Sequence, residues 1–154
     1  MKMIDQLKVL VVEDLVSDYD LISAGLEEIS INSVRANNIS QMKEKLNEEK
    51  FDALLLDLCM GDTTGLDTIK TAQQILEKST LNKDCPIIIL SGLNDFSLIN
   101  KALKMGVKDY LCKGEFVSSE LKRALSFATV TKGLPKRNVS LFSRFTDRIN
   151  QRLK

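Results

Sequence analysis

Histidine and tryptophan are both absent from this chain of 154 residues. Without histidine the chain cannot use serine–histidine catalysis, a histidine general base or a zinc site with histidine ligands. Aromatic residues make up only 5% of the sequence, and no apolar run approaches the roughly 20 residues of a membrane span. The first ten residues, interrupted by Asp5, also lack the apolar core of a signal peptide. We therefore expect a cytoplasmic protein whose chemistry uses aspartate, glutamate, serine, lysine or cysteine.

Cysteine is scarce as well. Cys59, Cys85 and Cys112 are odd in number, lack the spacing of a metal site and sit in or beside apolar runs. Small buried side chains in a reducing compartment are the interpretation that this pattern favours.

Charge is unevenly distributed along the chain. Residues 1–133 hold 16 basic and 20 acidic residues, whereas residues 134–154 hold 6 basic residues and 1 acidic residue. The composition changes near residues 133–135, where glycine, leucine and proline follow one another. We therefore predict one domain over residues 1–133 and a basic extension over residues 134–154.

The extension has the pattern of an amphipathic helix, because four large apolar residues fall on one helical stripe: Phe142, Phe145, Ile149 and Leu153. We expect this extra C-terminal helix to pack on its own domain or on a second copy of the chain, as a homodimer. Docking on an anionic membrane or an acidic partner is the alternative. At about 20 residues the extension is too short for a three-helix DNA-binding module, so we expect no DNA-binding domain.

Short runs of valine, isoleucine and leucine recur five times, over residues 8–12, 31–36, 52–57, 86–91 and 107–111. Between them apolar residues repeat at helical spacing, and the first such stretch uses Leu21, Ile22, Leu26 and Ile29. Strands that alternate with helices predict a parallel sheet with right-handed crossovers. The sequence thus predicts an α/β fold with a doubly wound, five-stranded parallel sheet and helices on both faces.

Polar residues and one glycine predict where the helices begin and end. The candidates are Ser17 or Asp18 for the first helix, Ser40 for the second, Asn94 or Asp95 for the fourth, and Gly106 just after the fourth.

Side chains that carry chemistry follow four of the predicted strands. Glu13 and Asp14 come after the first, Asp57 ends the third, Ser91 ends the fourth and Lys113 lies just beyond the fifth. Parallel strands end at a common edge, and open α/β sheets bind ligands outside that edge. We therefore expect these five residues to surround one pocket.

Three carboxylates that lie close together repel one another unless a cation sits between them. Oxygen-only ligands favour a hard ion such as Mg²⁺, which proteins hold with carboxylates, waters and a phosphate. Lys113 and the hydroxyl of Ser91 would then face the same anion. This set of groups suits phosphoryl transfer to Asp57 as an ionised nucleophile.

Four segments together resemble the receiver domains of bacterial two-component response regulators, over roughly residues 5–130. They are "VVEDLVSD" (11–18), "LLLDLCMGDTTGLD" (54–67), "IIILSG" (87–92) and "GVKDYLCKG" (106–114). The resemblance implies the flavodoxin-like strand order 2-1-3-4-5.

The resemblance also implies roles for the residues at the strand ends. Asp57 would be the phosphoacceptor, and Lys113 would pair with the phosphoryl group. Glu13, Asp14 and the backbone carbonyl of Cys59 would bind Mg²⁺ together with Asp57.

Ser91 and Tyr110 would form the switch that the resemblance implies. The hydroxyl of Ser91 would hydrogen-bond the phosphoryl group, and Tyr110 would then turn inward and change the surface of the neighbouring helices. This chain departs from the family at two glycines. Gly114 replaces the usual proline after Lys113, which disfavours a cis peptide there, and Gly61 replaces the usual proline beside the Asp57 loop.

The leading hypothesis is a stand-alone response regulator that receives a phosphoryl group from a sensor histidine kinase or a phosphotransfer protein. Its product would be a conformation that acts on a downstream protein target, so it would not be an enzyme in the metabolic sense. One alternative is a binding module that works without phosphate through its C-terminal helix. Another is a Mg²⁺-dependent aspartyl phosphatase, although Cys59 stands where that family has its general acid.

Overall fold

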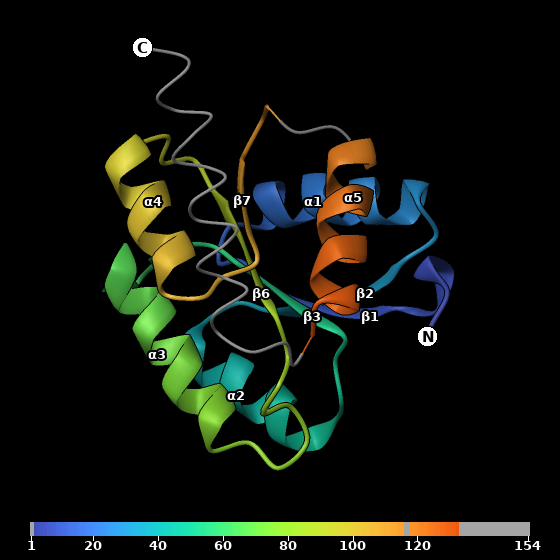
Figure 1. Cartoon of the computed structure of the whole chain (residues 1–154), viewed down its shortest axis with the longest axis horizontal. Helices are drawn as coiled ribbons and strands as arrows, with labels where there is room; N and C mark the ends of the chain where they lie inside the picture. The colour runs from blue at the N-terminus through green and yellow to red at the C-terminus, as the bar shows by residue number, and fades with distance from the viewer. Residues whose placement is uncertain (1, 116–117, 133–154) are drawn as a thin grey trace.

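A computed structural model describes residues 2–115 and 118–132, and its largest element is a sheet of five parallel strands. The strands are β1 (Lys8–Val12), β2 (Asn32–Ala36), β3 (Ala53–Leu56), β6 (Ile87–Ser91) and β7 (Asp109–Cys112). Their order across the sheet is β2-β1-β3-β6-β7 (Figure 1). Numbered along the chain, this is the expected order 2-1-3-4-5, and it confirms the predicted fold.

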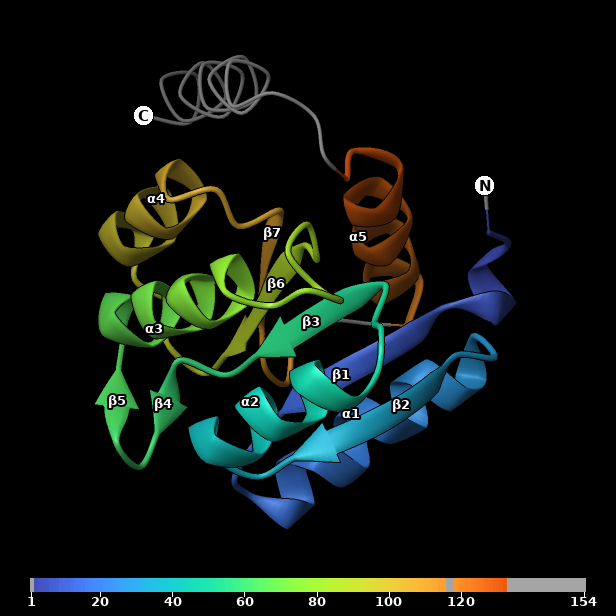
Figure 2. The ribbon, with the colours of Figure 1, turned by 90° about the horizontal axis from the view of Figure 1, so that it is seen from below.

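Helices cover both faces of the sheet (Figure 2). The first face packs against α1 (Val16–Glu28) and α5 (Ser118–Val130). The second packs against α2 (Ile39–Glu48), α3 (Leu66–Glu77) and α4 (Phe96–Lys104). A short 3-10 helix, η1 (Ile4–Gln6), precedes β1. Among the helices that the structure describes, none has the length and hydropathy that crossing a bilayer requires.

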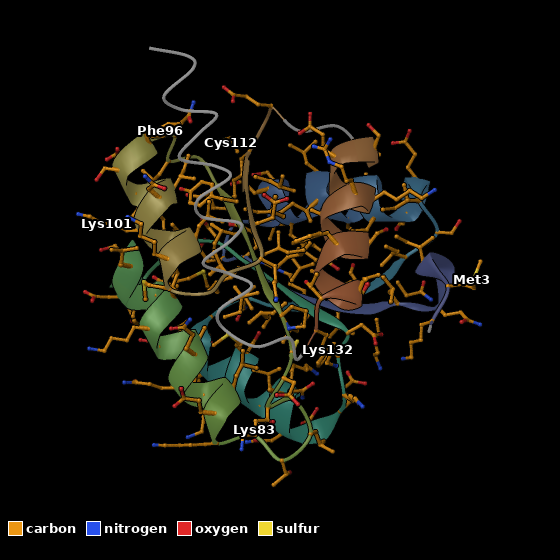
Figure 3. All side chains as sticks on the ribbon, in the orientation of Figure 1. Met3, Lys83, Phe96, Lys101, Cys112 and Lys132 are labelled. Atoms are coloured by element: carbon orange, nitrogen blue, oxygen red, sulfur yellow. The ribbon has the colours of Figure 1, made fainter. Side chains whose placement is uncertain are left out.

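Alternation along the strands decides which helices each side chain meets. Leu10 and Val12 of β1 pack in the cluster with α2, α3 and α4, whereas Val9 and Val11 pack in the cluster with α1 and α5. A strand covered on both faces must therefore be apolar throughout. All four residues of β3 are buried for this reason, and side chains fill the space between sheet and helices in Figure 3.

A small hairpin follows β3 and was not predicted. Its strands are β4 (Cys59–Met60) and β5 (Thr63–Thr64), which pair antiparallel. The buried hydroxyl of Thr68 donates to the carbonyl of Leu58 at 2.9 Å and contacts the hydroxyl of Thr63 at 2.8 Å. These contacts tie the loop after Asp57 to the first turn of α3.

Two of the predicted helix caps were wrong and two are confirmed. The N-cap of α1 is Leu15, so Ser17 and Asp18 lie inside the first turn. Asn38 caps α2 by accepting the N–H of Gln41 at 2.7 Å, which leaves Ser40 within the helix. Asp95 caps α4 as expected, and Gly106 adopts a φ of +104° directly after that helix.

Burial corrects two further expectations. The side chain of Leu21 is 71% exposed, because α1 buries a narrower stripe around Ile22 and Leu26. Cys85 is buried as predicted, but Cys59 is exposed and Cys112 is half-buried. Cys59 lies on the hairpin, outside the five-stranded sheet, and this position accounts for its exposure. The predicted extension over residues 134–154, with its homodimer and membrane alternatives, lies outside the described residues.

Asn82 is a buried polar residue that joins three segments of the fold. Its Nδ2 donates to the carbonyls of Leu46 at 2.7 Å and Glu49 at 2.8 Å, and its Oδ1 accepts the N–H of Phe51 at 2.8 Å. Its own N–H donates to the hydroxyl of Ser79 at 3.0 Å. One side chain that is 2% exposed thus satisfies backbone groups at the end of α2 and before β3.

Replacing Asn82 with alanine is expected to lower the free energy of unfolding by about 2–3 kcal/mol, because the backbone groups of Glu49 and Phe51 lose their side-chain partner and the carbonyl of Leu46 keeps only the hydroxyl of Ser79. Urea denaturation followed by far-UV circular dichroism measures this change. Lys83→Ala is the matched control, since Lys83 is an exposed neighbour (Figure 3), and its effect should stay within about 0.5 kcal/mol. Equal effects of the two substitutions would contradict the structural role of Asn82.

Candidate functional site

Charged side chains gather at one edge of the sheet, where four parallel strands end. Glu13 and Asp14 follow β1, Asp57 follows β3, Ser91 ends β6 and Lys113 follows β7. The parallel register sets the last residues of β1 and β3 side by side, and those of β6 and β7 likewise. All five predicted positions therefore lie at the same edge.

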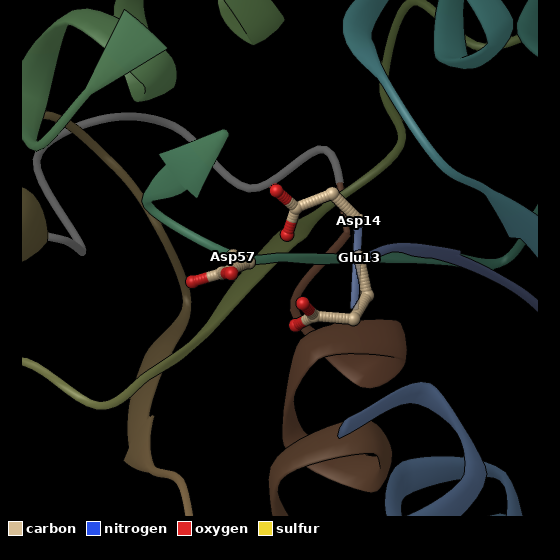
Figure 4. A group of neighbouring side chains, drawn as sticks. All are labelled: Glu13, Asp14 and Asp57. Atoms are coloured by element: carbon tan, nitrogen blue, oxygen red, sulfur yellow. The ribbon is translucent and has the colours of Figure 1, made fainter. Parts of the chain in front are cut away.

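Three carboxylates form the centre of the site. Glu13, Asp14 and Asp57 each offer one oxygen, and these oxygens lie within 4.8 Å of one another. Figure 4 shows the three side chains converging from the ends of two strands. Glu13 is 1% exposed and Asp57 is 5% exposed, whereas Asp14 is open to solvent. Two buried acids and one exposed acid thus leave the cluster accessible from one side.

The ammonium of Lys113 lies among acidic groups. Its Nζ is 2.5 Å from Oε2 of Glu13, 3.0 Å from Oδ2 of Asp57 and 2.9 Å from Oδ2 of Asp18. The backbone N–H of Lys113 donates to the carbonyl of Ser91 at 2.9 Å. The peptide after Lys113 is trans, as expected with a glycine in the next position. The structure therefore brings the predicted lysine directly to Asp57.

Burial raises the pKa of Glu13 to about 7, and the charge of Asp57 acts in the same direction. The ammonium of Lys113 and the N–H of Leu15, which donates to Oε1 of Glu13 at 3.1 Å, lower that pKa only in part. For Lys113 itself, burial would lower the pKa, but the three carboxylates around it raise the pKa above its ordinary value.

The raised pKa of Glu13 shows that the positive charge around it does not fully offset its lost hydration. A divalent cation bound by the carboxylates would supply the missing charge. The donor set consists of oxygen atoms only, and one of the three acids is open to solvent, which suits a hard ion that keeps part of its water shell. The residues present therefore fit a site for such an ion.

The loop after Asp57 is anchored to its carboxylate. The N–H of Cys59 donates to Oδ1 of Asp57 at 3.2 Å, and the N–H of Asp57 donates to the carbonyl of Val12 at 3.1 Å. One bond therefore orients the side chain of Asp57, and the other holds its main chain beside β1. The backbone of Cys59 lies next to the cluster, and a ligand role for its carbonyl stays a prediction.

Ser91 and Tyr110 meet at Leu93 rather than at the carboxylates. The fully buried hydroxyl of Ser91 accepts the N–H of Leu93 at 3.1 Å. The phenol of Tyr110 donates to the carbonyl of Leu93 at 2.6 Å. Burial raises the pKa of Tyr110, so its phenol stays protonated as a donor. The ring is only 9% exposed, which means that Tyr110 already faces inward.

Arg35 of β2 also shapes the site, although it was not predicted from the sequence. Its Nε donates to the carbonyl of Glu13 at 3.1 Å and its Nη2 donates to the carbonyl of Asp14 at 3.0 Å. The guanidinium lies 5.4 Å from the centre of the Tyr19 ring. Arg35 thus holds the main chain of the acidic pair. The predicted neighbouring positions of the first two strands could have indicated this role, because the pairing of β2 with β1 brings Arg35 beside Val11.

Comparisons with known proteins agree with this geometry. A family model described as the response regulator receiver domain matches residues 9–126. The transcriptional regulatory protein ZraR of Klebsiella oxytoca is 33% identical over 109 residues, which cover 71% of this chain and 23% of that protein. The chain thus spans about a quarter of the length of this relative.

Two solved structures share the fold. The receiver domain of a sensor histidine kinase from Pseudomonas aeruginosa, with a magnesium ion in its active site cleft, has a TM-score of 0.67 at 23% identity. The match covers 80% of this chain and 98% of that one. The second is a response regulator from Burkholderia pseudomallei, with a phosphorylated aspartic acid, a calcium ion and citrate. It has a TM-score of 0.64 at 25% identity, and the match covers 82% of this chain and 68% of that one. Because the family model matches most of the chain, this chain belongs to the receiver domains of two-component response regulators.

Proposed function

We propose that the chain is a phosphoacceptor switch in which Asp57 takes a phosphoryl group from a phosphohistidine of a sensor kinase or phosphotransfer protein. The supporting observation is the meeting of three carboxylates and the ammonium of Lys113 at one sheet edge. In the transfer, the P–N bond of the phosphohistidine breaks as a P–O bond to Asp57 forms. The histidine nitrogen keeps the electron pair of the broken bond.

The chain's own residues prepare Asp57 for this role. The buried strand β3 anchors the side chain, and the N–H of Cys59 orients Oδ1, so little reorganisation is needed when phosphate arrives. Lys113 places a positive charge 3.0 Å from Oδ2, where the negative charge of the phosphoryl group will lie.

Glu13, Asp14, Asp57 and the carbonyl of Cys59 would hold a Mg²⁺ ion. When bound, the ion neutralises negative charge on the phosphoryl oxygens. Arg35 supports this arrangement because it fixes the backbone of the two N-terminal acids. The magnesium ion in the Pseudomonas aeruginosa receiver and the phosphorylated aspartic acid in the Burkholderia pseudomallei regulator are consistent with the proposal.

Leu93 is the residue through which phosphate would be sensed. If the hydroxyl of Ser91 turned toward a phosphoryl group on Asp57, it would release the N–H of Leu93. The carbonyl of the same residue accepts the phenol of Tyr110. A change at Ser91 would therefore reach Tyr110 and α4 through one residue of the connecting loop.

Two alternatives are decided by the same experiments. A module that binds partners without phosphate would leave Asp57 unmodified, and its working part, residues 134–154, lies outside the described residues. An aspartyl phosphatase would need a general acid at Cys59, where partial desolvation first and then the charge of Asp57 raise the pKa of the thiol. A carboxyl group at that position would serve far better as an acid at neutral pH.

Incubation with acetyl phosphate and Mg²⁺ should add one phosphoryl group to the wild-type chain, as measured by intact mass spectrometry. Asp57→Asn should abolish the addition, because the amide is not a nucleophile. Asp84→Asn, which removes an exposed carboxylate, should leave the addition unchanged. An unmodified wild type would favour the binding module, and rapid turnover of phosphate esters would favour the phosphatase.

Asp14→Asn is expected to weaken Mg²⁺ binding about tenfold or more, because one of three charged ligand groups is lost. Asp14 is exposed, so the substitution buries no unpaired group. Isothermal titration calorimetry measures the affinity, with Asp84→Asn as the control. Equal affinities of the two variants would place the ion elsewhere.

Tyr110→Phe removes the donor to the carbonyl of Leu93. Phosphorylation by acetyl phosphate should stay within about twofold of wild type, because the phenol is not part of the acidic cluster. The NMR shift changes that beryllium fluoride and Mg²⁺ cause in α4 should shrink. Tyr19→Phe, whose phenol contacts the hydroxyl of Ser33, is the control, and identical shift changes in both variants would rule out the switch role.

A further inference from the structure

Asp18 is an additional partner of the active-site lysine. It lies in the first turn of α1, and its Oδ2 is 2.9 Å from Nζ of Lys113. Unlike Glu13 and Asp57, it is not part of the group of carboxylates that can share a metal ion. Asp18 therefore contacts the lysine without being committed to the ion or to the phosphoryl group.

The side chain of Lys113 needs such a partner. A lysine side chain loses much rotamer freedom when it is held in one place. The residue after it is Gly114, at a φ of +80°, which has no side chain that could pack against the lysine. The hydrogen bond from the N–H of Lys113 to Ser91 fixes the main chain only.

The other two partners of Lys113 have further tasks. In the proposed function Glu13 would also bind the ion and Asp57 would also carry the phosphoryl group, so both carboxylates would be shared with other groups. Asp18 can keep its contact, because an ammonium has three N–H donors and one suffices for Asp18. Helix α1 is itself anchored by the buried side chains of Ile22 and Leu26.

We infer that Asp18 is a positioning residue, which holds the ammonium of Lys113 over Asp57 and so speeds phosphorylation. This inference rests on the proposed function. The side chains of Asp18 and Lys113 are 31% and 18% exposed, and pairs exposed to this degree have modest effects. Loss of Asp18 should therefore slow phosphorylation by about two- to fivefold rather than abolish it.

The competing possibility is that Asp18 slows phosphorylation. Asp18 would act as a competitor if it drew Lys113 away from the phosphoryl group, and its loss would then speed phosphorylation. The sign of the rate change separates the two roles.

The experiment compares Asp18→Asn, Asp18→Glu and Asp20→Asn in the full chain. Asp20 lies on the same helix and is exposed, so Asp20→Asn changes the net charge as Asp18→Asn does. The first readout is the rate of phosphorylation by acetyl phosphate with Mg²⁺. The second is the reactivity of Lys113 toward an amine-labelling reagent, measured by peptide mass spectrometry relative to the exposed Lys101 (Figure 3).

We expect Asp18→Asn to raise the labelling of Lys113 and slow phosphorylation two- to fivefold, Asp18→Glu to restore both in part, and Asp20→Asn to change neither. Unchanged labelling in Asp18→Asn overturns the inference, as does an unchanged or faster rate. A wild type that takes up no phosphate refutes the proposed function and with it the effect on rate. The labelling still decides whether Asp18 holds Lys113.

Discussion

The ammonium of Lys113 between Glu13 and Asp57 is the contact on which the site depends. Both carboxylates are almost fully buried, and a buried carboxylate without positive charge nearby costs several kcal/mol. Lys113 offsets part of this cost, while burial raises the pKa of Glu13. The three carboxylates whose oxygens lie within 4.8 Å of one another are the observation that supports the proposed Mg²⁺ ion.

The sheet makes this crowding of charge possible. Apolar residues on both faces of β1 and β3 anchor the strands in the core, so the residues that follow them have little freedom to move apart. Arg35 adds a brace on the backbone of Glu13 and Asp14, and the hairpin after Asp57 is tied to α3 through Thr68. Rigid strand ends thus keep like charges together that would separate in a flexible loop.

The sheet and the strand-end residues were predictable because both depend on local pattern. Apolar runs identify strands, and right-handed crossovers bring their carboxyl ends to one edge. Asp18 was assigned only as a helix cap, since its real partner is 95 residues away and no local signal reports that distance. Leu21 was predicted to be buried because helical periodicity marks an apolar stripe without giving its width. Cys59 was predicted to be buried because no sequence pattern indicated the hairpin on which it lies.

The central claim is that Asp57 is the group that carries the phosphoryl group. Borohydride reduces an aspartyl phosphate to homoserine, which peptide mass spectrometry locates in the sequence. After treatment with acetyl phosphate and Mg²⁺, the account predicts homoserine at position 57 and at no other acidic residue. Homoserine at Asp14 or at another aspartate, with position 57 unmodified, would contradict it.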